Sequence, residues 1–120
     1  MPFVRVLWKE STFDSEDLAR LASSLPGIVS RTFSEFDPDH VVEPEMVDVR
    51  VETVGRFDVL HTNMLVTVLA RSEDARRRGR RGIVEDVTRG VEQVGCPPDT
   101  MVELVRTDRT STYEYRKAGP

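Results

Sequence analysis

Cysteine, lysine and long apolar runs are all scarce in this sequence. Cys96 is the single cysteine among 120 residues, which excludes an internal disulfide and favours a reducing compartment, the cytoplasm. No apolar run approaches the ~18 residues that a membrane-spanning helix needs. The start of the chain has no basic stretch followed by an apolar one, so neither export nor a membrane partner is expected.

Features that would indicate a nucleic acid, a metal or a nucleotide cofactor are also missing. The net charge is −4, although 15 of the 17 basic residues are arginines, and an acidic balance argues against nucleic acid as a partner. The two histidines, His40 and His61, are far apart and have no cysteine or carboxylate at ligand spacing. There is no phosphate loop or dinucleotide fingerprint. The sequence therefore predicts no cofactor and no metal.

The first half of the chain predicts a strand, a helix and a second strand. Residues 3–8 are rich in valine and aromatic side chains, as strands are. Asp14 is a suitable N-cap for a helix that ends near Asp37, and Pro26 predicts a kink or a break within it. Residues 46–54 then alternate in the manner of a strand.

The second half repeats that order. Residues 60–70 predict the clearest strand, and Ser72 to Asp74 would cap a second helix. Glycines at positions 79, 82 and 90 suggest that the backbone of this helix packs closely on a sheet. Residues 101–105 predict the last main strand, and 113–115 a short terminal one. The apolar ridge of the helix consists of Ala75, Gly79, Ile83, Val87, Val91 and Val94.

Two βαβ units in tandem are the simplest account of this order. Ser-Glu-Asp occurs at residues 15–17 and again at 72–74, at the start of each expected helix. We expect one α+β domain, a four-stranded mixed sheet with two helices on one face. The first unit would span 2–56, the second 57–107 and a tail 108–120. A ferredoxin-like dimeric α+β barrel shares this element order and is the structural alternative.

Pro2 directly follows the initiating methionine and begins the first expected strand. Removal of Met1 would expose a secondary amine. Burial disfavours the ammonium form of an amine, and a nearby cation disfavours it further, so both lower its pKa. A neutral amine near physiological pH is a usable general base.

Met-Pro at the start, two βαβ units and about 120 residues together resemble the tautomerase superfamily, whose catalytic group is an amino-terminal proline. The long members of that family hold two units and form trimers. The resemblance implies a cofactor-free isomerase acting on a small carboxylate, with Pro2 as its base and a homotrimer as its assembly.

Two arginines match motifs of that family. Val49-Arg50-Val51 resembles a Val-Arg-Val whose arginine binds and polarises substrate. Arg71, in Ala70-Arg71-Ser72-Glu73, resembles the carboxylate-binding arginine of a Gly-Arg-Ser-acidic turn. A guanidinium can hold a carboxylate with two hydrogen bonds. The alternatives are a solvated strand residue at Arg50 and an ordinary helix-flanking charge at Arg71.

Three further residues are accessory candidates. Glu114 lies in the tail, where dehalogenase-like members carry a glutamate that activates water, and Tyr113 beside it could line a pocket. His61 would share a strand face with Arg71. Glu103 stands where the dehalogenases have a tyrosine, which argues against dehalogenation or hydration.

Other uses of the same fold stay open. A protonated Pro2 could act as a general acid in hydration, dehalogenation or decarboxylation. A non-catalytic trimeric binding or assembly protein would keep the fold without the chemistry. The dense basic run Arg76, Arg77, Arg78, Arg80 and Arg81 is interpreted as the polar face of the second helix, with a patch for nucleic acid or an acidic partner as the alternative.

Overall fold

The computed structural model describes residues 2–71 and 79–106. Neither described helix is long and apolar enough to cross a membrane. The strands are β1 (Phe3–Trp8), β2 (Asp48–Thr53), β3 (Met64–Ala70) and β4 (Thr100–Arg106), and the helices are α1 (Ser15–Phe36) and α3 (Arg80–Val94). Two short 3-10 turns, Glu10–Thr12 and Pro44–Met46, precede α1 and β2.

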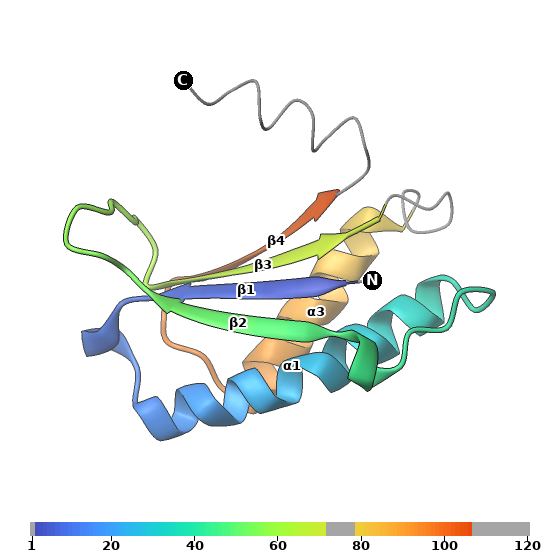
Figure 1. Cartoon of the computed structure of the whole chain (residues 1–120), viewed down its shortest axis with the longest axis horizontal. Coiled ribbons are helices and arrows are strands. Elements are labelled where there is room, and N and C mark those ends of the chain that lie inside the picture. Colours follow the sequence, from blue (N-terminus) through green and yellow to red (C-terminus); the bar gives the residue numbers. More distant parts are fainter. Residues whose placement is uncertain (1, 72–78, 107–120) are drawn as a thin grey trace.

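The four strands form one mixed sheet in the order β2-β1-β3-β4. Within each half the two strands are parallel, β1 with β2 and β3 with β4, and the halves join through the antiparallel pair β1–β3. Both helices lie on the same side of the sheet (Figure 1). The expected α+β fold with two βαβ units is therefore confirmed.

The core lies between the helices and one face of the sheet. Side chains alternate between the two faces of a strand, so every second residue of β1 and β3 points into this core. Neither α1 nor α3 covers the opposite face, which carries the other half of the side chains. The buried apolar residues of β1, β3 and the helices include Val4, Val6, Trp8, Met64, Val66, Val68, Leu21, Leu25, Phe33, Ile83, Val87 and Val91.

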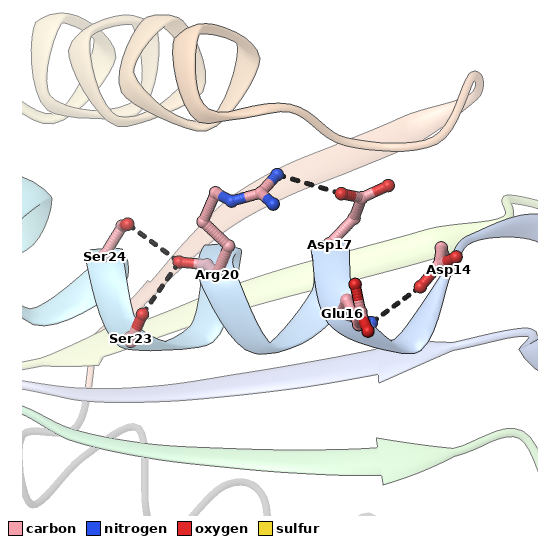
Figure 2. Close-up of polar contacts among 6 residues, drawn as sticks. All are labelled: Asp14, Glu16, Asp17, Arg20, Ser23 and Ser24. Atoms are coloured by element: carbon pink, nitrogen blue, oxygen red, sulfur yellow. Dashed lines mark hydrogen bonds and ion pairs between the residues drawn. The ribbon is translucent and has the colours of Figure 1, made fainter.

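The start of α1 is held by polar contacts local to the helix. The Asp14 side chain accepts a hydrogen bond from the Glu16 amide at 2.7 Å, which satisfies one of the free N–H groups of the first turn (Figure 2). Arg20 pairs with Asp17 at 2.9 Å one turn later. The expected N-cap is confirmed.

The helix α1 continues through Pro26, so of the two predicted outcomes, a kink or a break, the break is absent. Proline removes one hydrogen bond of the helix and crowds the preceding turn. Leu25 and Val29, on either side of Pro26, are fully buried in the core. Their packing outweighs the local preference for ending the helix.

The glycines of α3 allow close contact with α1 rather than with the sheet. A Cβ at Gly82 would meet the Phe36 ring at 2.7 Å, and a Cβ at Gly90 would meet Ile28 at 2.8 Å. The expectation of close packing was right, but its partner is the neighbouring helix.

Two strand boundaries differ from those expected. The strand β3 begins at Met64 and not at residue 60, because residues 54–63 form a loop beyond the end of the sheet. The strand β2 begins at Asp48, because Pro44 starts a 3-10 turn. The expected cap at 72–74 and the expected strand at 113–115 lie outside the described residues.

Candidate active site at the start of the central strand

Pro2 is buried directly before β1, a central strand of the sheet. The strand register pairs Phe3 with Leu69 on one side and with Asp48 on the other. Continued by one residue, it places Pro2 level with Ala70 and Val47, and both of these are buried. Pro2 therefore lies between two apolar neighbours, one on each side.

Arg71 lies at the same end of the sheet. It directly follows Ala70, the last residue of β3, and it is exposed. Because β1 and β3 are antiparallel, the end of β3 lies beside the start of β1. The fold therefore brings Arg71 to the end of the sheet where Pro2 is found.

The loop between α1 and β2 forms another part of this end. Its Val42 is buried, and the Val42 carbonyl accepts a hydrogen bond from the Ser30 hydroxyl at 2.5 Å. The Val42 amide donates to the Ser34 hydroxyl at 3.1 Å. These bonds fix the loop to α1, and the loop in turn leads to Val47 beside Pro2.

Arg50 occupies a different place. In the register of β1 and β2 it lies opposite Arg5, and Arg5 is three residues along the chain from Pro2. The alternation of β1 puts Arg5 on the face that the helices leave open, whereas Pro2 falls on the side of Val4. The Arg50 side chain is 69% exposed, and its Nε lies 3.2 Å from Glu52 Oε1. Within one chain, Arg50 is thus separated from Pro2 by the sheet.

The neighbour of Arg50 was missed by the sequence analysis. The triplet Val-Arg-Val occurs at residues 4–6 and again at 49–51, and the two copies lie side by side in parallel register. Glu52 Oε1 lies 3.9 Å from Arg5 Nε as well, so one carboxylate serves both guanidinium groups. The repeated triplet was the signal in the sequence that could have revealed this pair.

Additional positive charge lies at the Pro2 end of the sheet. The start of α3 and the ends of β3 and β4 all lie at this end (Figure 1). A hollow of about 450 Å³ there is lined by Arg80, Arg81, Val84, Glu85 and Leu104. The positive end of the helix dipole of α3 adds to these charges. This end of the molecule is therefore suited to attracting anions.

Among the accessory candidates, His61 does not join this group. His61 belongs to the loop 54–63, at the opposite end of β3 from Arg71. Seven strand residues separate the two by about 20 Å. Tyr113 and Glu114 lie outside the described residues. Among the residues that are described, no three His, Cys, Asp or Glu side chains gather as metal ligands would.

Neither a known family model nor a curated protein matches the sequence. Solved structures do match the fold. One is a malonate semialdehyde decarboxylase studied for its decarboxylase and hydratase activities, with 14% identity, a TM-score of 0.64 and coverage of 88% of this chain and 84% of that one. A fused 4-OT that forms an asymmetric trimer has 12% identity, a TM-score of 0.61 and coverage of 90% and 88%.

A second malonate semialdehyde decarboxylase, inhibited by 3-bromopropiolate, matches along 98% of both chains with 7% identity and a TM-score of 0.64. At these identities the similarity concerns the arrangement of helices and strands. The chain thus has the fold of the tautomerase superfamily.

Proposed function

We propose that this chain is a cofactor-free keto–enol tautomerase of small carboxylated 2-oxo or enol acids. The observation that carries the proposal is the position of Pro2, buried at the start of the central strand β1 and level with Ala70, the residue before Arg71. Once Met1 is removed, the Pro2 nitrogen would be a base held in apolar surroundings, at the end of the sheet where several arginines lie.

Each group would have a defined part in the reaction. The neutral Pro2 amine takes a proton from the hydroxyl or carbon of the substrate at one end of the enol system, and the resulting ammonium returns a proton to carbon at the other end. The Arg71 guanidinium holds the substrate carboxylate with two hydrogen bonds. It also stabilises the negative charge that develops on the enolate oxygen.

Burial supports the choice of Pro2 as base. Transfer of a charged ammonium group into apolar surroundings is costly, so the neutral form of the amine is favoured. The arginines at the same end of the sheet act in the same direction and also attract an anionic substrate. Both effects serve a reaction that begins with proton removal.

Arg50 fits this scheme only through a second subunit. Its side chain projects from the open face of the sheet, away from the Pro2 of its own chain. We assign it to a substrate site completed by a neighbouring copy in a homotrimer. The strands β2 and β4 end the described sheet on either side, and unpaired sheet edges favour association. The trimer formed by the similar fused 4-OT supports this assembly.

Decarboxylation is the second candidate. Two malonate semialdehyde decarboxylases share this fold, each with a TM-score of 0.64. In that reaction a protonated Pro2 would hydrogen-bond the carbonyl oxygen of a 3-oxo acid while carbon dioxide leaves. Release of carbon dioxide from malonate semialdehyde, without ketonisation of enols, would favour it over tautomerisation.

The decisive experiment begins with the intact mass of protein purified from its native host, which shows whether Met1 is absent. Processed protein is then assayed for ketonisation of 2-hydroxymuconate and phenylenolpyruvate, and treated with 3-bromopropiolate. We expect turnover of at least one enol and a covalent adduct on the amino-terminal peptide. Protein that retains Met1 is the control and should show neither. Equal activity in processed protein and in the control would exclude Pro2 as the base and leave a trimeric scaffold as the better account.

A further inference from the structure

The first strand of the chain, β1, has a partner on each side along its whole length (Figure 1). Every residue from Phe3 to Trp8 is in register with β2 on one side and with β3 on the other. Val4 is fully buried, and Pro2, directly before the strand, is buried as well. A terminal segment that is tied into a sheet does not fray as a free terminus does. The start of β1 is therefore part of the folded core.

The proposed chemistry requires cleavage of the bond next to this buried residue. A methionine aminopeptidase adds water across the Met1–Pro2 amide. The methionine carbonyl carbon takes the hydroxyl, the Pro2 nitrogen takes the proton, and free methionine leaves. Before cleavage the Pro2 nitrogen belongs to an amide and has no basic electron pair. The peptidase has to hold the residues on both sides of the bond, and proteases act on exposed, open segments rather than on buried ones.

Release of Pro2 from the folded protein would require the opening of β1. Pro2 lies level with Ala70 and Val47, which are both buried, and Phe3 follows it in register with both neighbouring strands. To bring Pro2 into the cleft of another protein, β1 has to separate at this end from β2 and from β3. Opening of a core strand is rare, because its free energy approaches that of global unfolding. Cleavage through a rare open state is slowed in proportion to the population of that state.

The strands that enclose β1 are made later than β1 itself. The strand β2 ends at Thr53 and β3 at Ala70, so the sheet around Pro2 cannot close before Ala70 has been added. At about 5–20 residues per second, the ribosome takes roughly 3–14 s to reach that point. During this interval Pro2 has no β3 beside it, and the Met1–Pro2 bond is open to a peptidase.

We propose that Met1 is removed before β1 is enclosed between β2 and β3, and that closure of the sheet protects the Met1–Pro2 bond in any chain that has kept it. The inference rests on the proposed removal of Met1 and adds when that removal has to occur. A chain that folds first keeps an amide at Pro2 and stays without a base. The share of active protein is thus decided during synthesis, by competition between cleavage and folding.

The test varies the time at which the peptidase is present. The full chain is made in a reconstituted translation system without methionine aminopeptidase, and the purified enzyme is added either from the start or after the released chain has folded. Intact mass gives the fraction that has lost methionine. We expect loss of Met1 after early addition. After late addition we expect cleavage at least about 100-fold slower than that of a peptide of residues 1–10, because the open state is rare.

Two results would overturn the proposal. One is cleavage of the folded chain as fast as that of the peptide, which would show that the sheet does not protect the bond. The other is retention of Met1 after both early and late addition while the peptide is cleaved, which would show that the growing chain is not the substrate.

A variant with a displaced bond is the matched control. Insertion of Gly-Ser-Gly-Ser-Gly-Ser between Pro2 and Phe3 keeps the Met1–Pro2 bond and the whole of β1, but moves the bond away from the sheet. Circular dichroism and thermal unfolding check that the variant folds. We expect the folded variant to lose Met1 after late addition at a rate close to that of the peptide. Resistance of this variant would show that the burial of Pro2 is not the cause of protection, and the proposal would fail.

The outcome does not depend on the proposed chemistry, because the readout is mass. Enol turnover is measured separately on the products of early and late addition. If the folded chain resists cleavage and the processed chain shows no turnover, the order of events stands and the tautomerase proposal fails. If the processed chain turns over enols and the folded chain is cleaved as fast as the peptide, the tautomerase proposal stands and the order of events fails.

Discussion

Gly90 of α3 lies so close to Ile28 of α1 that a Cβ on the glycine would sit 2.8 Å from Ile28 Cγ2, with two more Ile28 carbons within 3.3 Å. Gly90 is buried, and Ile28 is 6% exposed. An isoleucine is stiff at its Cβ and has little room to move in a packed core. The distance between the two helices is therefore set by the absence of a side chain at this position.

Gly90→Ala should lower the free energy of unfolding by about 1–3 kcal/mol, because the added methyl group forces the helices apart. Alanine is otherwise the better helix former, so a loss of stability would be due to the contact alone. Chemical denaturation monitored by circular dichroism gives the value. An unchanged midpoint would mean that Ile28 moves aside at no cost.

Gly27→Ala is the matched control. It lies within α1, and no atom would approach its Cβ within 4 Å. The same substitution should therefore raise stability by about 0.4–1 kcal/mol, through helix preference and the smaller entropy of the unfolded chain. A loss at both positions would show that the effect does not come from the contact with Ile28.

Thr32→Val should destabilise the protein by about 1–3 kcal/mol. Thr32 is fully buried, and its hydroxyl donates to Asp86 Oδ2 at 2.5 Å, which links α1 to α3. Valine keeps the shape of the side chain and removes the donor, so a carboxylate oxygen loses its partner in the helix interface. Thr88→Val serves as the comparison in the same denaturation assay, since the Thr88 hydroxyl donates to the Val84 carbonyl of its own helix. If both variants lose the same stability, the hydrogen bond between the helices contributes no more to the free energy of unfolding than the one within α3.

Pro2→Ala in processed protein should reduce the ketonisation rate roughly a hundred- to ten-thousand-fold, the range that general-base catalysis covers. Alanine keeps a terminal amine but loses the ring and part of the basicity. Stopped-flow absorbance at the enol band measures the rate. Arg20→Ala, on the exposed side of α1, is the control and should keep full activity.

Arg71→Ala should impair carboxylated enols far more than their methyl esters, because only a carboxylate uses both donors of the guanidinium group. The ratio of kcat/KM for acid and ester measures this effect. We expect that ratio to fall at least tenfold, about 1.4 kcal/mol, in the variant. An equal loss for both substrates would assign Arg71 to a role other than binding the carboxylate.

Most of the fold could be predicted because the hydrophobic patterns are clear. Buried and exposed residues alternate in β1 and β3, and apolar residues recur every four positions in α3, at Ile83, Val87 and Val91. These patterns mark the core face of each element. Each half has two strands connected by a helix, and this order allows few arrangements of the four strands in a sheet. The helix does not break at Pro26, one of the two outcomes predicted there, because tertiary burial around it outweighs a local preference.

The site was harder to predict from the sequence. Arg71 could be placed from its position after a strand, since the ends of antiparallel strands meet. His61 was grouped with Arg71 because both would lie on one face of a strand over 60–70. The strand β3 begins at Met64, so His61 lies in the loop before it, at the other end of the strand from Arg71. The partner of Arg50 depends on the register between β1 and β2, which local patterns do not determine unless the repeated triplet is noticed.

The antiparallel junction of β1 and β3 has a consequence for how many reactive ends one chain can offer. The two halves are related by an approximate two-fold rotation, and the residue that corresponds to Pro2 is Asn63, directly before β3. Two separate βαβ chains would present two terminal amines, one at each end of the sheet. Here the second end is a continuous backbone, in which the Asn63 amide donates to the Asp99 carbonyl and its side chain donates to the Pro98 carbonyl, both at 2.9 Å. Joining the halves thus gives a chain in which only one of two similar ends can carry a free amine.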